Sequence, residues 1–163
     1  MPVDSARAIG AVSHAAPRPV PAILAGGAIT GVLDLLYAMA VYSPHRPLLI
    51  PQAIATGILG ASSYKGGVPT IILGVVLHFV IALGAATVYY LASRRIPLLV
   101  ERPVLCGMIF GGLVYCFMHG VVIPLSAVPH HPTRFIYQAA EFVEHWFMVG
   151  LPISFSVRRY TRG

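Results

Sequence analysis

Four apolar runs dominate the sequence, and each is long enough to cross a lipid bilayer as a helix. They cover about residues 22–42, 69–92, 104–125 and 135–157. A membrane-spanning helix needs roughly 20 residues for about 30 Å of hydrocarbon. With 57% hydrophobic and only 10% charged residues, the chain is also too apolar for a soluble domain. The sequence therefore predicts an all-α integral membrane protein built as a four-helix bundle.

The segment between the first two runs is different in character. It reads SPHRPLLIPQAIATGILGASSYKGG, and its apolar middle is too short to span a bilayer. Pro44, Pro47 and Pro51 bound it on one side, and the Gly66-Gly67 pair bounds it on the other. Such boundaries favour a short interfacial or re-entrant helix between the first two spans.

Positive charges predict the orientation of the bundle, because the cytoplasmic flanks of membrane helices carry an excess of Lys and Arg. Eight basic residues fall on one side of the predicted bundle, namely Arg7, Arg18, Arg94, Arg95, Arg102, Arg158, Arg159 and Arg162. Three fall on the other side, namely Arg46, Lys65 and Arg134. Both termini are therefore expected to be cytoplasmic. Residues 1–21, which lack apolar periodicity, are expected to form a disordered tail before one transmembrane domain over residues 22–160.

The formal net charge of +6 does not indicate a nucleic-acid partner. The basic residues flank the apolar runs and form no basic face, so the expected partner is the lipid bilayer. Small residues on helix faces let membrane helices approach closely. The predicted packing residues are Gly27, Gly31, Gly74, Gly107 and Gly111. Because such faces also serve dimerisation, a homo-oligomer or a membrane-complex partner stays open.

Ionisable side chains interrupt the apolar runs at one common level. They are Asp34, His78, His119, Glu141 and His145. At 1.5 Å per residue, all five lie within roughly 9 to 15 Å of the outer boundary. A charge at the centre of a membrane helix costs about 2.5–3.5 kcal/mol on insertion scales. We therefore expect these groups to face one another in the outer half of the bundle, where they are partnered, protonated or hydrated.

The residue types of this cluster are suited to a metal ion. His78, His119, Glu141 and His145 offer three imidazoles and one carboxylate, a set that fits zinc or iron. A Glu and a His four residues apart on one helix can both reach an ion over that face. Three further residues are expected as hydrogen-bond partners of the ligands or as proton-handling groups, namely Asp34, Glu144 and Tyr115.

The same residues also fit other functions, which stay open at this point. A pair such as Glu141 and His145 can simply fix helix packing through an interhelical hydrogen bond, worth about 0.6 kcal/mol in membranes. The cluster can instead handle protons near the outer surface, or His78 and His145 can hold haem between them. No nucleophile and base stand together with an oxyanion site, so an enzyme is not expected. The competing class is a non-catalytic structural or assembly subunit of a membrane complex.

Two stretches in the second half of the chain resemble a known family. Residues 117–129 read FMHGVVIPLSAVP, and residues 140–159 read AEFVEHWFMVGLPISFSVRR. Together with His78 they resemble the distal half of the YagU-type inner-membrane proteins of bacteria, over about residues 68–160. The resemblance implies a small multi-spanning protein of the bacterial inner membrane, without an established biochemical activity. It supports the predicted architecture and polar positions but implies no reaction.

Overall fold

The computed structural model describes residues 18–129 and 134–162, and every regular element within those ranges is helical. Three helices are long and apolar enough to cross a membrane. They are α1 (Pro19–Tyr42), α3 (Gly67–Ser93), and α5 (Pro103–Phe117) together with a first π segment (Met118–Val122). The prediction of an all-α fold is therefore confirmed, and the first three predicted spans coincide with these three candidate helices. Residues 1–17 of the predicted tail lie outside the described ranges, and the last residues of that tail already belong to α1.

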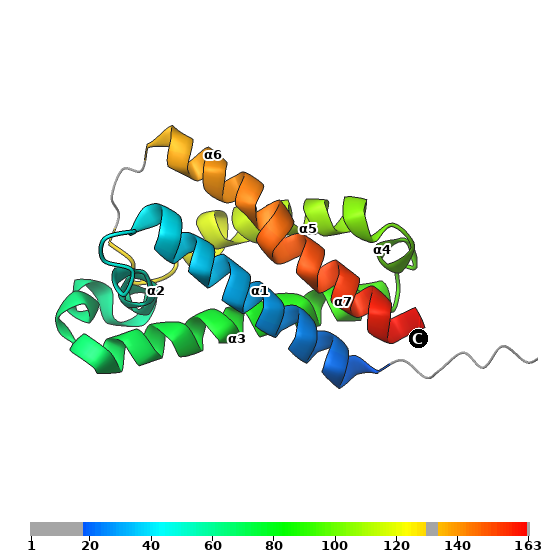
Figure 1. Ribbon diagram of the computed structural model, residues 1–163, viewed down its shortest axis with the longest axis horizontal. Helices are drawn as coiled ribbons and strands as arrows, with labels where there is room; N and C mark the ends of the chain where they lie inside the picture. Colours follow the sequence, from blue (N-terminus) through cyan, green and yellow to red (C-terminus); the bar gives the residue numbers. More distant parts are fainter. Residues whose placement is uncertain (1–17, 130–133, 163) are drawn as a thin grey trace, which may run out of the picture.

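The fourth predicted span is helical but is built in three pieces. Helix α6 (Phe135–Glu144) leads into a second π segment (His145–Gly150) and then into α7 (Leu151–Arg162). Figure 1 shows α6 and α7 following one another along the length of the molecule beside α1. Among the described residues, only the three helices named above are long and apolar enough to span by themselves. The four-helix membrane bundle is thus confirmed only as a helical fold with three candidate spans.

A short helix does lie between the first two spans, as the sequence predicts. Helix α2 (Leu49–Leu59) is followed by a 3₁₀ turn (Gly60–Lys65), and both pack near the start of α3. A methyl group built on Gly74 of α3 would collide with the carbonyl of Pro51, so the two helices touch at backbone distance. At the opposite end of α3, the short helix α4 (Leu98–Glu101) leads into α5.

The two ends of the molecule differ in charge. Figure 1 shows the start of α1, helix α4 and the end of α7 at one end, and α2 with the start of α6 at the other. The backbone N–H of Arg18 donates to the carbonyl of Tyr160 at 3.1 Å, which joins the start of α1 to the end of α7. The arginines of the first end are Arg18, Arg94, Arg95, Arg102, Arg158 and Arg159. The charge asymmetry that orients the predicted bundle is therefore also an asymmetry of the fold.

Small residues let the helices approach closely at two crossings. A methyl group on Gly27 would lie 2.9 Å from the Cα of Leu83, where α1 crosses α3. Helix α6, the second π segment and α7 together form the last helical path, residues 135–162. Where α5 crosses this path, methyl groups on Gly107 and Gly111 would collide with its backbone atoms. Gly150 faces Gly107 there in the same way. Four of the predicted packing glycines, Gly27, Gly74, Gly107 and Gly111, thus lie close to the backbone of a neighbouring element, whereas Gly31 faces the ring of Phe79.

The buried core occupies one half of the molecule, between α1, α3 and α7. It contains Ala22, Ala86, Tyr89, Tyr90, Val149, Ile153 and Val157. Elsewhere the outward faces are apolar, with exposed Leu, Ile, Val and Phe side chains along α1, α3 and α5. An apolar exterior of this extent is what a bilayer-embedded surface requires, and it is foreign to a soluble monomer.

Candidate functional site

One stripe of α1 faces the last helical path, and it carries Asp34 at its end. Gly26, Thr30 and Asp34 are spaced four residues apart, so they share one side of the helix. A methyl group on Gly26 would lie 3.3 Å from the Cα of Ile153. One turn further on, the hydroxyl of Thr30 donates to the carbonyl of Val149 at 3.2 Å. These two contacts position Asp34 against the junction of α6 and the second π segment.

Asp34, Glu144 and His145 form a compact group of metal-ligating side chains. One donor atom from each lies within 4.8 Å of the other two. The Nδ1 atom of His145 is 2.9 Å from a carboxylate oxygen of Glu144 and 2.9 Å from the backbone carbonyl of Glu141. Because a carbonyl oxygen only accepts, Nδ1 carries the proton and donates to these oxygens. In the neutral ring, Nε2 then keeps its lone pair.

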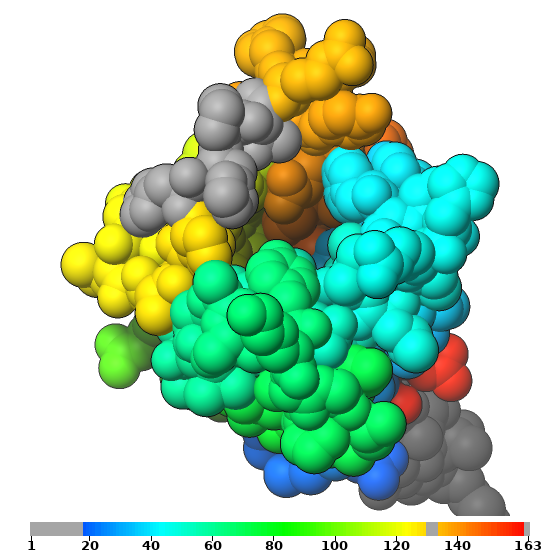
Figure 2. Space-filling view, turned by 90° about the vertical axis from the view of Figure 1, so that its left-hand side faces the viewer, coloured from blue at the N-terminus to red at the C-terminus, as the bar shows by residue number. Residues whose placement is uncertain are grey.

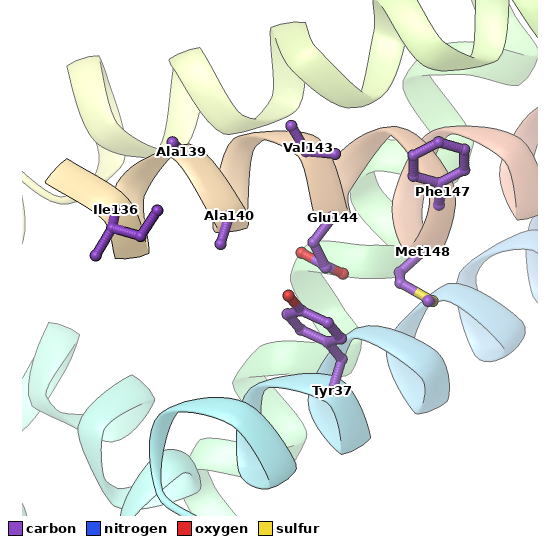
Figure 3. A pocket seen from close by; sticks show the side chains of 8 residues that line it. All are labelled: Tyr37, Ile136, Ala139, Ala140, Val143, Glu144, Phe147 and Met148. Carbon is purple, nitrogen blue, oxygen red and sulfur yellow. The ribbon is translucent and has the colours of Figure 1, made fainter.

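Glu144 is the most deeply buried member of this group. Its side chain is only 2% exposed, and its Oε1 atom has no hydrogen-bond partner. Figure 3 shows the carboxylate in the gap between α6 and α1, with the ring of Tyr37 pointing toward it from α1. Leaving a buried acceptor unsatisfied costs about 1–3 kcal/mol, and more for a charged group. An orphaned carboxylate oxygen inside a donor cluster therefore indicates a missing cation or hydrogen-bond donor.

Two of the histidines lie in π segments. His119 belongs to the first π segment and His145 opens the second. Short π segments are uncommon and occur frequently at functional sites. Here each histidine ring bonds the carbonyl four residues earlier, Tyr115 for His119 at 3.2 Å and Glu141 for His145 at 2.9 Å. Both rings are thus held in place by their own helices.

The remaining predicted ligands lie in two pairs on either side of this group. His78 donates through Nε2 to the carbonyl of Gly31 at 2.9 Å, and the same atom lies 3.7 Å from the carboxylate of Asp34. On the other side, Nε2 of His119 lies 3.7 Å from the carboxylate of Glu141, and both side chains are 32% exposed.

Tyr115 connects the second of these pairs to the central group. Its ring stacks on His119 with centroids 4.1 Å apart, and it meets the ring of His145 edge-on at 5.5 Å. Tyr115 thus contacts both histidines through its ring, and its role as a hydrogen-bond partner or proton-handling group stays a prediction.

The structure brings the predicted residues to one region, but the residues that lie close together are not those of the predicted ligand set. Across the described ranges, the group of three or more donors close enough for one ion is Asp34, Glu144 and His145. The predicted ligand set of His78, His119, Glu141 and His145 does not form such a group, and it stays a prediction. Asp34 and Glu144, which the sequence placed behind the ligands, are members of the central group instead.

Sequence reasoning missed two residues that build the site. Thr30 holds the second π segment, and Gly26 allows α1 to approach it. Their spacing of four from Asp34 was the available signal, since it places all three on one helix face. The neighbouring Gly27 and Gly31, which the sequence predicts as packing residues, face α3 instead.

Comparison with protein-family models, with curated proteins and with solved structures finds no match for this chain. The resemblance to the YagU-type proteins therefore stays a prediction. The chemistry of the Asp34, Glu144 and His145 group is what remains to indicate a function.

Proposed function

We propose that this is a small membrane protein that binds a divalent transition-metal ion, zinc or iron, through Asp34, Glu144 and His145. The observation that carries the proposal is the orphaned Oε1 of Glu144, buried within a group of three metal-ligating side chains. Two helices that are far apart in the sequence supply these side chains. Such a site exists only in the folded bundle.

Electrostatics favour a cation at this position. Two like charges about 4 Å apart repel by about 4 kcal/mol at an effective dielectric constant near 20. Among the described residues, the ion pairs of Asp34 and Glu144 are with histidines, and none is with Lys or Arg. The two histidines, His78 and His145, offset these carboxylates only when both rings are protonated, whereas a divalent ion carries two positive charges by itself. Protons would neutralise the carboxylates as well, which is why the test must measure metal directly.

The ligand types point to zinc or iron. Two carboxylate oxygens and one imidazole nitrogen make three protein ligands, which leaves further coordination positions open. Ligating histidines in proteins usually donate their second ring N–H to a carbonyl or carboxylate, which fixes the ring. His145 makes this kind of bond through Nδ1 to the Glu141 carbonyl, which leaves Nε2 for the ion.

Metal analysis of the purified protein tests the proposal. The chain is purified in detergent, stripped with a chelator and titrated with Zn²⁺ or Fe²⁺ by calorimetry, with elemental analysis of the product. We expect one ion per chain, and loss of binding in Asp34→Asn and Glu144→Gln.

Matched variants separate this site from the predicted ligand set. Glu141→Gln and His119→Gln remove groups of the same chemistry that pair with each other outside the central group. We expect both to bind metal as the wild type does. Loss of binding in these two with retention in Glu144→Gln would favour the predicted set instead. A wild-type protein that takes up no metal would leave the structural or assembly subunit as the better description.

We further propose that the path of α6, the second π segment and α7 is a fourth span, with both termini in the cytoplasm of a bacterial inner membrane. The second π segment and α7 contact both α1 and α5, and α6 contacts α5, as expected for a member of the bundle. Its lower apolarity arises from Glu141, Glu144 and His145, which face other helices, and from the arginines near its end. The excess of arginine at the end that holds the start of α1 and the end of α7 supports the orientation.

A further inference from the structure

A groove lies beside the metal-ligating group, between α1 and the path of α6 and the second π segment. Its volume is about 540 Å³, and Glu144 lines it together with Tyr37 of α1. The rest of the lining is apolar and comes from α6 and the second π segment, including Ala140, Val143 and Met148. Figure 3 shows Glu144 as the acidic member of this lining.

The groove opens to the side of the bundle and not only to its end. Val143 and Phe147, which line it, are each more than two fifths exposed, and so they face the surroundings of the chain. Toward the outer end, the rings of Tyr42 and Tyr137 bridge α1 and α6 with centroids 6.1 Å apart. Figure 2 looks onto that end and shows a recess between α6, in orange, and the cyan residues after α1. In a membrane, the groove would therefore be open to the acyl chains.

We propose that this groove binds a single-chain lipophilic ammonium ion, with the chain against α6 and the ammonium group at the Glu144 carboxylate. Because that side chain is only 2% exposed, it turns toward the groove when the ligand binds. The apolar lining suits an alkyl chain, and the volume lies within the range of ordinary ligand sites. The orphaned Oε1 requires a hydrogen-bond donor, and the nearby Asp34 adds a second negative charge. An ammonium group supplies both charge and N–H donors. This inference stands apart from the metal proposal, although both ligands would compete for Glu144.

Binding of dodecylammonium to the protein in nanodiscs tests the inference. We expect saturable binding above that of empty discs, weakened by about tenfold or more in Glu144→Gln, because a charge-assisted hydrogen bond is lost. Glu141→Gln is the matched control, since that carboxylate pairs with His119 and does not line the groove. Dodecyltrimethylammonium keeps the charge without N–H donors, and dodecanol keeps a donor without the charge. We expect both to bind more weakly than dodecylammonium.

A second variant fills the groove while Glu144 stays intact. Ala140→Trp places a large side chain in the lining, and Ala140→Leu is a milder form of the same change. We expect dodecylammonium binding to fall in both, with thermal unfolding and zinc binding as in the wild type. Equal binding by wild type and Glu144→Gln, or by the filled variants, would overturn the inference. If the protein binds zinc but not dodecylammonium, only the proposal for the groove is overturned. If it binds dodecylammonium but not zinc, only the metal proposal is overturned.

Discussion

Glu144 and His145 are neighbours in the sequence, yet their polar atoms differ in how many hydrogen-bond partners they have. The Nδ1–H of His145 has two acceptors at 2.9 Å, whereas only one oxygen of Glu144 has a partner. The imidazole is therefore fully satisfied on that side, and the carboxylate is not. A buried carboxylate oxygen without a hydrogen-bond partner lowers the stability of the metal-free protein. Proteins commonly tolerate such a loss of stability where function requires it.

Glu144→Gln should stabilise the metal-free protein. The amide oxygen can still accept from His145, and the amide N–H₂ can donate to the Asp34 carboxylate, which replaces repulsion with a hydrogen bond. We expect a gain of about 1 kcal/mol in the free energy of unfolding, typical of one hydrogen bond. Thermal or denaturant unfolding in detergent with excess chelator measures it. Glu141→Gln, at a site that is 32% exposed, should change little. A less stable Glu144→Gln would show that the carboxylate already has a favourable partner.

At this scale the sequence predicts the level of the polar groups but not their partners. Counting residues from the span ends places Asp34, His78, His119 and Glu141 at similar depths, and the structure does bring them to one region. The spacing of four between Glu141 and His145 suggested that their side chains act together. Instead, His145 bonds the backbone carbonyl of Glu141, and the carboxylate of Glu141 turns to His119. A π segment depends on tertiary packing, so residue spacing on a regular helix could not reveal this.

Among the elements, α5 and the second π segment cross so closely that there is no room for an added methyl group. A methyl group on Gly111 would collide with the carbonyl oxygen of His145, whereas one on Gly84 of α3 would meet no atom within 4 Å. Gly111→Ala should therefore push the helices apart and lower the free energy of unfolding by about 1–3 kcal/mol. Gly84→Ala should be neutral or stabilising, since Ala is favoured over Gly in helices by roughly 0.5–1 kcal/mol. Thermal unfolding of both variants in detergent checks this, and similar stabilities would show that the crossing is looser than the structure indicates.

A buried polar network attaches the α2 region to α3. The hydroxyl of Thr70 donates to the carbonyl of Ser63 at 2.8 Å, and Gln52 Nε2 donates to the same hydroxyl at 3.2 Å. The hydroxyl of Ser63 donates in turn to the carbonyl of Gln52 at 2.7 Å. Secondary elements that depend on so few long-range bonds open more readily than a packed core.

Thr70→Val should loosen this attachment without unfolding α3. Removing the hydroxyl leaves the amide of Gln52 short of an acceptor, at a cost of about 1–3 kcal/mol. We expect faster amide hydrogen exchange over residues 49–65, measured by mass spectrometry. Thr87→Val is the control on the same helix, because its hydroxyl bonds only the carbonyl of Leu83 within α3. Unchanged exchange in Thr70→Val would mean that apolar contacts alone hold α2 in place.

Helix positions were the most predictable part of the fold. Apolar length and flanking Pro and Gly residues gave α1, α3 and α5 with small errors, and also the short helix between the first two spans. The last helical path was harder, because its polar residues reduce the apolar signal and only packing against α1 and α5 compensates for them. Its division by a π segment leaves no mark that apolar periodicity can detect.

Whole-molecule topology depends on whether that last path crosses the membrane. Three candidate spans alone would place the start of α1 and the end of α7 on opposite faces, whereas four crossings would place them on the same face. In the fold, Arg18 and Tyr160 are joined by a backbone hydrogen bond, so one face must hold both. An α6 to α7 path lying flat on the surface cannot meet this condition while α1, α3 and α5 all span.

Labelling of single cysteines decides the topology. In a background with Cys106→Ala and Cys116→Ala, cysteines are placed by Ser62→Cys, Arg95→Cys, Arg134→Cys and Arg159→Cys, all at exposed positions. A membrane-impermeant maleimide applied to spheroplasts should label positions 62 and 134, and should reach positions 95 and 159 only after permeabilisation. Because only arginine-rich flanks stay in the cytoplasm, this pattern follows from four crossings with both termini inside. If position 159 is labelled without permeabilisation while position 95 stays protected, the last helical path does not cross the membrane. That result would also contradict the hydrogen bond between Arg18 and Tyr160.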